Sequence, residues 1–273
     1  MIVVSAAGGA LGRLVLDGLA AAAPGAEVVA AVRDPAKAAD LGVTVRRGDY
    51  DDPASLRTAF AGADRLLLIS SPELDGARRI AQHRAAVEAA REVGVGSIVY
   101  TSFLGAGTQA TGLTEAHYAT ERLIEDSELA FTFLRNPFYS EAFLNPSLLE
   151  AVKTGELPHG TEGRGLNTAF RRDLADAAVR VLTSDGHAGR AYDLTGPLWT
   201  YPELAAALSA ASESEVTAVP RTSPAPGAFA FLETLARSGA LELQTPDLAS
   251  LLPRPARSAA EYAASLFAGQ SLK

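Results

Sequence analysis

Residues 5–12 read SAAGGALG, immediately after a strand-like β-branched run and before a stretch with helical spacing. A glycine-rich turn in this position is where dinucleotide-binding folds hold a pyrophosphate. Gly9 lets the backbone approach such an anion, and Gly12 lets the helix pack close to the strand. Ala6 replaces the first glycine of the pattern and fits only with a negative φ, unless Gly8 supplies the flexibility two residues later. The alternative is an ordinary strand-to-helix turn in an alanine-rich chain.

Composition excludes several classes of function. The chain has 273 residues, a net charge of -8 and no cysteine. It therefore has no disulfide, thiolate metal site or cysteine nucleophile, and its acidic balance disfavours nucleic acids and anionic membranes as partners. No stretch reaches the roughly 18 apolar residues of a membrane span, and no signal-peptide pattern is present. We expect a cytoplasmic protein without a nucleic-acid or membrane partner.

The first half of the chain alternates β-branched runs with longer alanine-rich runs of helical spacing. This alternation indicates βαβ units and a parallel sheet that is buried on both faces. The expected strands cover residues 2–5, 27–32, 43–46, 65–69, 97–101 and 131–134, and the expected helices cover residues 11–22, 53–61, 77–93 and 114–126. The predicted fold class is α/β, with a parallel sheet and a smaller, mostly helical C-terminal lobe.

The second half has a looser pattern, with aromatic and proline-containing loops after Arg135. The expected helices of this half cover residues 139–153, 171–183, 201–211, 227–238 and 258–268. We expect a dinucleotide-binding domain over residues 1–153 and a substrate-binding lobe over residues 154–273, with some segments of the lobe returning to the sheet.

The end of the second expected strand reads AAVRDPAK and bears on the choice of cofactor. A site specific for NAD usually has a carboxylate here, whereas Arg33 offers a planar cation suited to the 2′-phosphate of NADP. Lys37 adds a second positive charge, and Asp34 is placed to cap a short helix that begins at Pro35. We therefore expect NADPH to be preferred over NADH. Solvated surface charges are the alternative interpretation of both cations.

Several motifs in order resemble the NmrA-like branch of the atypical short-chain dehydrogenase/reductases, and within it the bacterial NAD(P)H:quinone oxidoreductase type 2 group. The motifs are SAAGGALG, VRDPAKAADLGVTVRRGDYDDPASL, LLLISSPE, AQHRAAVEAAREVGVGSIVYTS, LRNPFYSE, RRDLADAAVRVL and YDLTGP. The resemblance implies a domain with a doubly wound parallel sheet of the Rossmann type that binds NADPH, a smaller C-terminal lobe, and a small-molecule acceptor of the quinone type.

The resemblance also implies a set of cofactor-binding residues at the carboxyl ends of the strands, where ligands of open parallel sheets lie. It places Asp49 and Tyr50 near the adenine, and Ser70 and Ser71 beside the ribose and nicotinamide. Together with the loop and the two cations, the expected cofactor-binding residues are Ser5, Gly9, Ala10, Leu11, Gly12, Arg33, Lys37, Asp49, Tyr50, Ser70, Ser71, Thr101, Ser102, Asn136 and Pro137.

The helix that reads EAHYATERL holds the candidate proton donors, Tyr118 and His117. Many short-chain dehydrogenases place a lysine four residues after the catalytic tyrosine, but this chain has Arg122 there, and His117 stands four residues before Glu121. The alternative is an exposed helix with a His/Glu pair and a tyrosine resting on the sheet. Quinones need little acid catalysis, because hydride addition gives a phenolate-like product that takes protons from water.

The candidate substrate contacts are one histidine and four aromatic residues, although core packing explains each of them equally well. They are His83, Phe138, Tyr139, Phe143 and Phe170. No cluster has metal-site spacing, so we expect no metal. The leading function is an NAD(P)H-dependent oxidoreductase acting on a quinone or a similar electrophile. A non-catalytic NmrA-like redox sensor and a reductase or isomerase of a biosynthetic intermediate are the alternatives, and the oligomeric state is left between monomer and homodimer.

Overall fold

The structure is a computed structural model that describes residues 1–108, 112–223, 225 and 227–268. Its contacts divide the chain into two compact units. The first unit comprises Met1–Asn136, Arg171–Leu194 and Ser250–Pro253, and the second comprises Pro137–Phe170, Thr195–Ala249 and the residues from Arg254 onward. The boundary expected at residue 153 stays a prediction, because compact units need not coincide with domains that fold independently.

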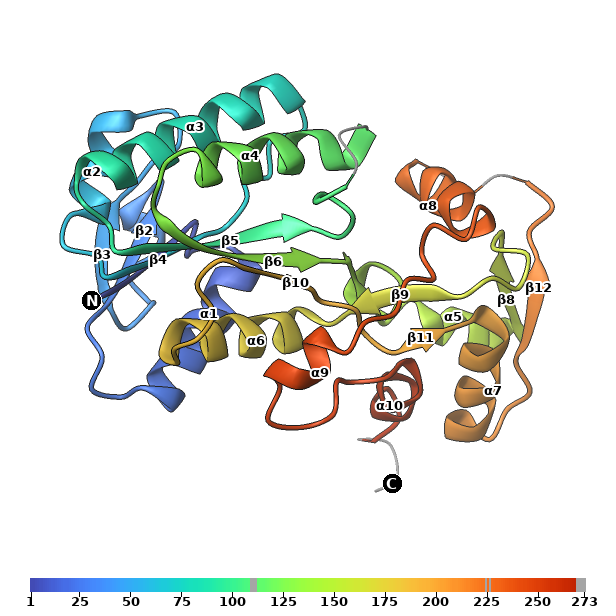
Figure 1. The fold of residues 1–273 in the computed structure, drawn as a ribbon. Coiled ribbons are helices and arrows are strands. Elements are labelled where there is room, and N and C mark those ends of the chain that lie inside the picture. Colours follow the sequence, from blue (N-terminus) through green and yellow to red (C-terminus); the bar gives the residue numbers. More distant parts are fainter. Residues whose placement is uncertain (109–111, 224, 226, 269–273) are drawn as a thin grey trace. The chain divides into compact units, whose positions relative to one another are not determined.

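The first unit is built on a seven-stranded sheet in which every pair of neighbouring strands is parallel (Figure 1). The strand order is β10-β6-β5-β4-β1-β2-β3, which is the doubly wound order with one strand added at an edge. The strands are β1 (Ile2–Ser5), β2 (Val28–Val32), β3 (Thr44–Arg47), β4 (Arg65–Leu68), β5 (Ser97–Phe103), β6 (Ala130–Asn136) and β10 (Arg190–Asp193). The predicted fold class and all six expected strands are confirmed, and β10 is the strand of this sheet that was not predicted.

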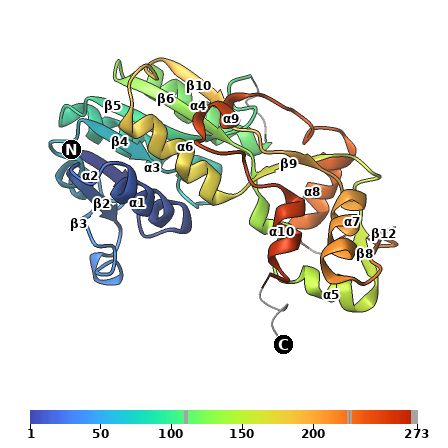
Figure 2. The same cartoon turned by 90° about the horizontal axis from the view of Figure 1, so that it is seen from below.

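Helices cover both faces of this sheet. They are α1 (Ala10–Ala22), α2 (Pro53–Phe60), α3 (Gly76–Glu92), α4 (Glu115–Glu125) and α6 (Arg171–Thr183), with short 3-10 turns at Pro35–Lys37 and Gly112–Thr114. Figures 1 and 2 show α1 and α6 side by side on one face, and α2, α3 and α4 on the other. Because both faces are covered, strands such as β1 and β4 are almost wholly apolar and buried.

The second unit combines helices with two small sheets. One sheet has the order β11-β9-β7, from Leu198–Trp199, Leu166–Ala169 and Phe138–Tyr139, and the other pairs β8 (Glu156–His159) with β12 (Thr217–Pro220). The helices are α5 (Leu148–Thr154), α7 (Tyr201–Ser212), α8 (Ala228–Arg237) and α10 (Ala259–Ser265). The short helix α9 (Asp247–Leu251) begins in this unit, and its last two residues belong to the first. Helical residues outnumber strand residues here, as expected for the lobe.

The continuous helix expected over residues 139–153 is wrong. A two-residue strand, a 3-10 turn at Ser140–Ala142 and α5 occupy this region instead. Pro146 disfavours the helical conformation of the residue before it, and the side chain of that residue, Asn145, accepts hydrogen bonds from the Ser147 backbone N–H at 3.0 Å and hydroxyl at 2.6 Å. This local turn replaces the helical hydrogen bonds.

Close packing of α1 on the first strand constrains position 12. A Cβ on Gly12 would lie 2.6 Å from the Cα of Ala7 and 2.8 Å from its carbonyl oxygen, closer than real contacts allow. The neighbouring atoms belong to the backbone and cannot rotate away. Glycine is therefore required here by space.

Gly12→Ala is expected to lower the free energy of unfolding by about 1–3 kcal/mol, the usual cost of overpacking. Gly8→Ala is the matched control in the same loop, because a Cβ there would meet only Val32 Cγ1 at an ordinary 3.8 Å. Chemical denaturation of both variants measures the difference. Equal stability of the two would contradict the packing argument.

Candidate functional site

The glycine-rich loop adopts a conformation that the sequence did not predict at Ala6. The φ of Ala6 is 47°, in the left-handed region, and Gly8 has no positive φ. The expectation of a negative φ at Ala6, or of flexibility moved to Gly8, is therefore wrong. The turn closes with the Gly9 N–H donating to the Ala6 carbonyl at 3.0 Å. An alanine in this region carries a strain of roughly 1–2 kcal/mol, which the surrounding hydrogen bonds must offset.

Helix α1 begins directly after this turn. Gly9 is the N-cap, and no side chain caps the first turn of the helix. Ala10 is exposed, whereas Leu11 and Gly12 are buried against the strand. The first backbone N–H groups of a helix lack internal partners and attract anions, so this turn has the donors that a pyrophosphate needs.

The two cations after β2 differ in their surroundings. Arg33 is exposed and makes no hydrogen bond or ion pair with any residue that the structure describes. The Lys37 ammonium lies 3.4 Å from the Asp34 carboxylate. Asp34 also caps the 3-10 turn, accepting from the Ala36 N–H at 3.2 Å, as expected. Arg33 is thus the cation of this pair that is free to bind a ligand.

A salt bridge that sequence reasoning missed joins α1 to the segment after β2. Arg13 binds both carboxylate oxygens of Asp40, at 2.6 and 3.2 Å, and its Nε donates to the Gly8 carbonyl at 3.1 Å. The hydrogen bond from Arg13 holds the pKa of Asp40 below its ordinary value. This pair ties the glycine-rich loop to the stretch that carries Arg33. No local pattern links residues 27 positions apart.

Ser5 and Tyr50 support the end of the first strand. The Ser5 hydroxyl donates to the Leu67 carbonyl at 3.0 Å and accepts from the Ile69 N–H at 2.9 Å. It also lies 2.6 Å from the Tyr50 hydroxyl, which donates to the Ile69 carbonyl at 2.6 Å. These bonds hold the ends of β1 and β4 together. Both residues were expected to bind cofactor, and that role stays a prediction.

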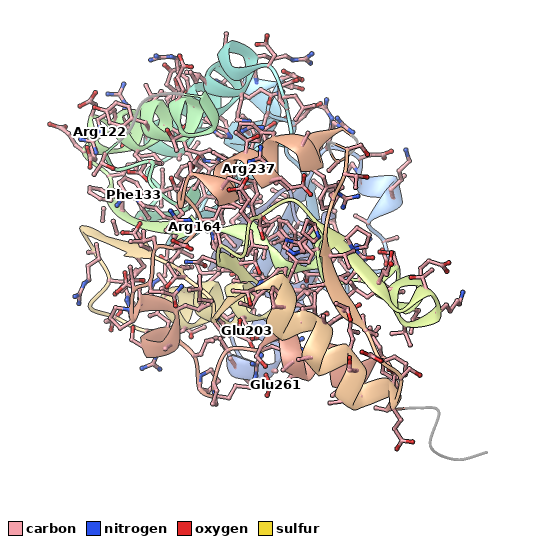
Figure 3. All side chains as sticks on the ribbon, turned by 90° about the vertical axis from the view of Figure 1, so that its right-hand side faces the viewer. Arg122, Phe133, Arg164, Glu203, Arg237 and Glu261 are labelled. Carbon is pink, nitrogen blue, oxygen red and sulfur yellow. The ribbon has the colours of Figure 1, made fainter. Side chains whose placement is uncertain are left out.

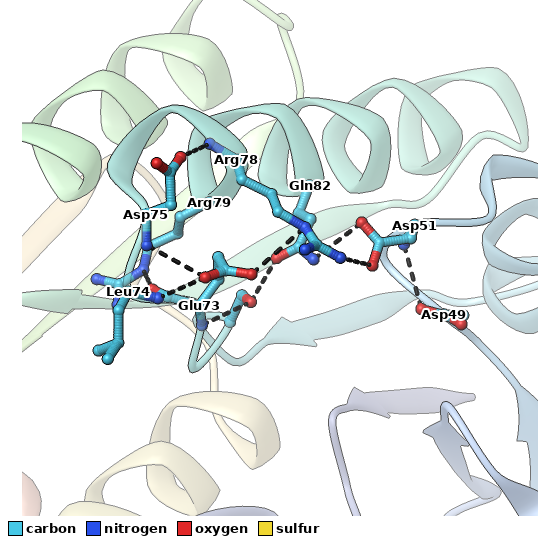
Figure 4. Close-up of polar contacts among 9 residues, drawn as sticks. Asp49, Asp51, Glu73, Leu74, Asp75, Arg78, Arg79 and Gln82 are labelled. Carbon is cyan, nitrogen blue, oxygen red and sulfur yellow. Dashed lines mark hydrogen bonds and ion pairs between the residues drawn. The ribbon is translucent and has the colours of Figure 1, made fainter.

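The loop between β4 and α3 is held by a polar cluster, drawn in Figure 4. Asp51 accepts from Gln82 at 3.0 Å and from Arg78 at 3.0 Å, and Arg78 also lies 3.3 Å from Glu73. The hydrogen bond from Gln82, followed by that from Arg78, lowers the pKa of Asp51. Asp49 accepts from the Asp51 N–H at 3.2 Å, so the expected adenine-side residue joins the same cluster.

His83 is a residue of α3 and is fully buried, with contacts to α4 and to the segment that follows β4. Its Nε2 accepts from the Ser71 N–H at 2.9 Å, and its Nδ1 lies 2.8 Å from the Thr120 hydroxyl. The Ser70 N–H in turn donates to the Thr101 hydroxyl at 2.9 Å. His83 was expected to contact substrate. With both nitrogens engaged by the protein, we propose instead that it orders the loop that carries Ser70 and Ser71.

The other candidate histidine, His117, is buried except for 8% of its surface. Its Nδ1 lies 2.9 Å from the hydroxyl of Tyr100, which is on β5 and fully buried. Phe103, at the end of the same strand, lies with its ring centroid 5.8 Å from the imidazole. A buried tyrosine hydroxyl needs a hydrogen-bond partner. The tyrosine in the apolar run of β5 therefore indicated that such a partner exists, and it was the one sequence feature that pointed to this pair.

The expected pairing of His117 with Glu121 is wrong. Glu121 is fully buried and binds Arg135 of β6 in a two-pronged arrangement, at 2.9 and 2.8 Å. The Ser102 hydroxyl donates to the same carboxylate at 2.6 Å. Gly107 lies so close to the Arg135 guanidinium that a Cβ would collide with it. A buried carboxylate needs a charged partner, and the planar guanidinium satisfies both of its oxygens.

Tyr118 lies on α4 and is partly exposed. The Arg122 guanidinium carbon is 5.4 Å from the centre of the Tyr118 ring, and Arg122 also binds Glu125 at 2.6 Å. The spacing of four therefore brings tyrosine and cation together as expected, but the contact is with the face of the ring. The catalytic role of Tyr118 stays a prediction.

Of the remaining expected cofactor residues, Asn136 ends β6, and its carbonyl accepts from the Leu104 N–H at 2.9 Å. Pro137 follows it as the first residue of the second unit. The aromatic residues expected at the substrate are Phe138, Tyr139, Phe143 and Phe170. Phe143 and Phe170 are buried in the core of that unit, and Phe138 packs against it. Their substrate contacts stay predictions.

The second unit holds a pocket of about 420 Å³ beside α8. Its charged residues are Arg221, Glu233 and Arg237, the last of which is labelled in Figure 3. Arg221 lies 3.2 Å from Glu233, and Arg237 donates to the Gly160 carbonyl at 2.9 Å. Both arginines thus attach α8 to its neighbours.

Two further findings concern the described residues only. Within residues 1–108, 112–223, 225 and 227–268, no group of three or more His, Asp or Glu side chains could hold a metal ion. In that same part of the chain, no helix is both long enough and apolar enough to cross a membrane.

Burial of the histidines makes stability depend on pH. Burial lowers the pKa of His83 to about 3, with smaller contributions from His117 and Arg79. Its ordinary value is 6.5, so the unfolded chain binds the proton more readily. Stability from this residue is complete above pH 6.5 and is lost as the pH falls toward 3. Between pH 6.5 and pH 5 we expect a loss of about 2 kcal/mol from His83.

Denaturation of wild type and His83→Gln at pH 7 and pH 5 checks this, because the variant should lose less stability between the two pH values. His187→Gln is the control, since His187 is only partly buried whereas His83 is fully buried. A pH dependence that is unchanged in His83→Gln would contradict the assignment.

Comparisons with known proteins identify the family of the chain. A family model described as NAD(P)H-binding matches residues 6–185. Quinone oxidoreductase 2 of Escherichia coli (strain K12) is 43% identical over 222 residues, which are 80% of this chain and 76% of that protein.

Two solved structures are similar over nearly the whole chain. The Citrobacter sp. triphenylmethane reductase complexed with NADP(H) has a TM-score of 0.91 and 34% identity, covering 97% of this chain and 100% of that one. The NADPH-dependent quinone oxidoreductase of Escherichia coli complexed with NADPH has a TM-score of 0.88 and 37% identity, covering 98% and 100%. An NmrA-like family domain-containing oxidoreductase of Aspergillus flavus is 29% identical over 92% of this chain and 90% of that protein. The chain therefore belongs to the NAD(P)H-binding family.

Proposed function

We propose that this protein is an NADPH-dependent oxidoreductase that reduces a quinone or a similar small electrophilic acceptor. The observation that carries the proposal is the glycine-rich turn of the first unit, in which α1 starts uncapped beside an unengaged arginine at the end of β2. The relatives named above support it, since one is a quinone oxidoreductase and two were solved with NADP(H) or NADPH.

The residues present fit a bound NADPH. Gly12 keeps α1 close to the strand, so the first N–H groups of the helix face the space where a pyrophosphate would lie. Arg33 would hold the 2′-phosphate through charge-assisted hydrogen bonds. Bound NADPH supplies a hydride, and the protein must then hold the acceptor in place and keep competing reactions out.

Reduction of a quinone requires little general-acid catalysis from the protein. A quinone that receives a hydride becomes a phenolate-like anion, and water supplies the remaining proton. The residue four positions after Tyr118 is Arg122, whose guanidinium lies over the tyrosine ring and binds Glu125. The described contacts of Tyr118 therefore support orientation of the acceptor over acid catalysis as the main contribution of the protein.

The direct test is NADPH oxidation in the presence of a panel of quinones, with a plain ketone as the comparison acceptor. Steady turnover with at least one quinone is expected. Tight NADPH binding with no turnover on any acceptor would overturn the proposal and favour a redox sensor.

Tyr118→Phe is expected to retain most of the quinone-reductase rate in single-turnover measurements. General-acid catalysis typically contributes about 10² to 10⁴-fold, so an essential tyrosine would show clearly. A hundredfold fall in quinone reduction with unchanged NADPH affinity would mean that the tyrosine is the proton donor.

Arg33→Ala is expected to weaken NADPH binding by about 1.5–3 kcal/mol, the range for hydrogen bonds to charged groups, with little change for NADH. Arg57→Ala serves as the control, because that exposed arginine of α2 binds Glu92 at 3.2 Å. Titration of both variants with NADPH and NADH measures the effect. Equal losses for the two cofactors would remove Arg33 from the 2′-phosphate site.

A further inference from the structure

Tyr100 and His117 form a buried pair that the proposed function does not yet use. The Tyr100 hydroxyl and the His117 Nδ1 are 2.9 Å apart, and the tyrosine is fully buried. The Nε2 atom of His117 makes no hydrogen bond with the residues that the structure describes. The exposed fraction of the surface of His117 is 8%. One nitrogen of the imidazole thus contacts the buried tyrosine, while the other has no partner among the described residues.

The direction of this hydrogen bond follows from its neighbours. Burial lowers the pKa of His117 to about 4 and raises that of Tyr100, so both groups are neutral at pH 7. The hydroxyls of Thr120 and Ser70 also lie within bonding reach of the Tyr100 hydroxyl. An imidazole sp² nitrogen is a better acceptor than an alcohol or phenol oxygen, which favours donation from Tyr100 to Nδ1. With that direction, His117 would carry its single proton on Nε2.

We propose that Tyr100 is a positioning residue that holds His117 as the Nε2–H tautomer, and that this N–H donates a hydrogen bond to the oxygen of the acceptor. The second half of the proposal rests on the proposed function. The first half concerns the protein alone.

The chemistry requires hydrogen bonding only. Negative charge develops on the acceptor oxygen as the acceptor takes up a hydride, and a donor already aimed at that oxygen stabilises the charge. A quinone gains two electrons and one hydrogen from the hydride, and one proton from water then completes the hydroquinone. The neutral imidazole keeps its own proton throughout.

The groups around His117 keep it neutral. Arg79 of α3 lowers its pKa further, the neighbouring His83 is neutral, and Glu121 of α4 is bound to Arg135. The contribution of His117 to the rate should therefore be constant between pH 6 and pH 9. Its effect would change only where the imidazole becomes charged.

The tautomers can be read directly from 15N spectra of the protein labelled at its four histidines. His83 serves as an internal reference for the other tautomer. Its Nε2 accepts from the Ser71 N–H, so its proton must lie on Nδ1. The expected result is Nε2–H for His117 and Nδ1–H for His83, each resonance being assigned by its own glutamine variant. A His117 resonance of the Nδ1–H form in the wild type would overturn the proposal.

Tyr100→Phe keeps the ring and removes the hydroxyl. Tyr192→Phe is a matched control in the same unit, because the Tyr192 hydroxyl lies 2.8 Å from the Nδ1 of His187. Each variant should move the Nδ1 resonance of its own histidine and leave the other unchanged. Tyr100→Phe should also lower kcat for quinone reduction by about tenfold with unchanged NADPH affinity, less than the loss of a complete oxyanion donor. If Tyr100→Phe leaves the His117 Nδ1 resonance unchanged, or leaves kcat for quinone reduction unchanged, the positioning role is overturned.

His117→Gln and His117→Leu separate hydrogen bonding from proton transfer. Glutamine keeps an N–H donor near the position of Nε2, so it should retain at least tenfold more quinone reduction than leucine. Equal loss in both variants would overturn the hydrogen-bonding role. If the wild type reduces no quinone, the proposed function and the acceptor contact fail together, whereas the 15N spectra still decide the role of Tyr100.

Discussion

The arrangement of the glycine-rich loop at the edge of the sheet depends on how closely α1 crosses the first strand. At Gly12 the helix is so near the backbone of Ala7 that no Cβ fits. The chain must therefore reverse within a few residues of the end of β1, and the left-handed φ of Ala6 accomplishes that reversal. The hydrogen bond from the Gly9 N–H to the Ala6 carbonyl then fixes the start of the helix. The start of α1 lies at the edge of the sheet without a side-chain cap, and the backbone strain at Ala6 is the consequence of placing it there.

A second constraint is the burial of polar groups beneath the ends of β4 and β5. His83, Ser71 and Thr120 satisfy one another there without a net charge. Gln82, the neighbour of His83, accepts from the Ser71 hydroxyl at 2.5 Å and donates to Asp51. One turn of α3 thus connects the segment after β3 with the loop after β4. Such a network is rigid only if every member is satisfied, which explains why these residues are buried as neutral hydrogen-bonding groups.

Local periodicity was sufficient to predict the sheet, and it failed where distant residues decide the structure. The six buried strands are short β-branched runs, and Arg33 follows the second in a position that the βαβ pattern defines. The edge strand β10 has two exposed residues among its four, so it lacks an apolar signature. The pairs Arg13–Asp40 and Asp51–Gln82 join residues 27 and 31 positions apart, and only the folded chain brings them together. The φ of Ala6 was missed because alanine rarely adopts that region, and close packing overrode the preference.

The partner of Glu121 shows how such a distant contact sets the chemistry of a nearby group. Helical spacing favours His117, four residues earlier, but Arg135 on β6 offers two parallel donors and a charge that is not lost on burial. Had the carboxylate paired with the imidazole, it would have favoured the protonated histidine, with both nitrogens carrying hydrogen. Because the arginine neutralises Glu121, burial dominates at His117 and its pKa falls to about 4. The imidazole is then left neutral, with one nitrogen able to accept from Tyr100 and the other able to donate.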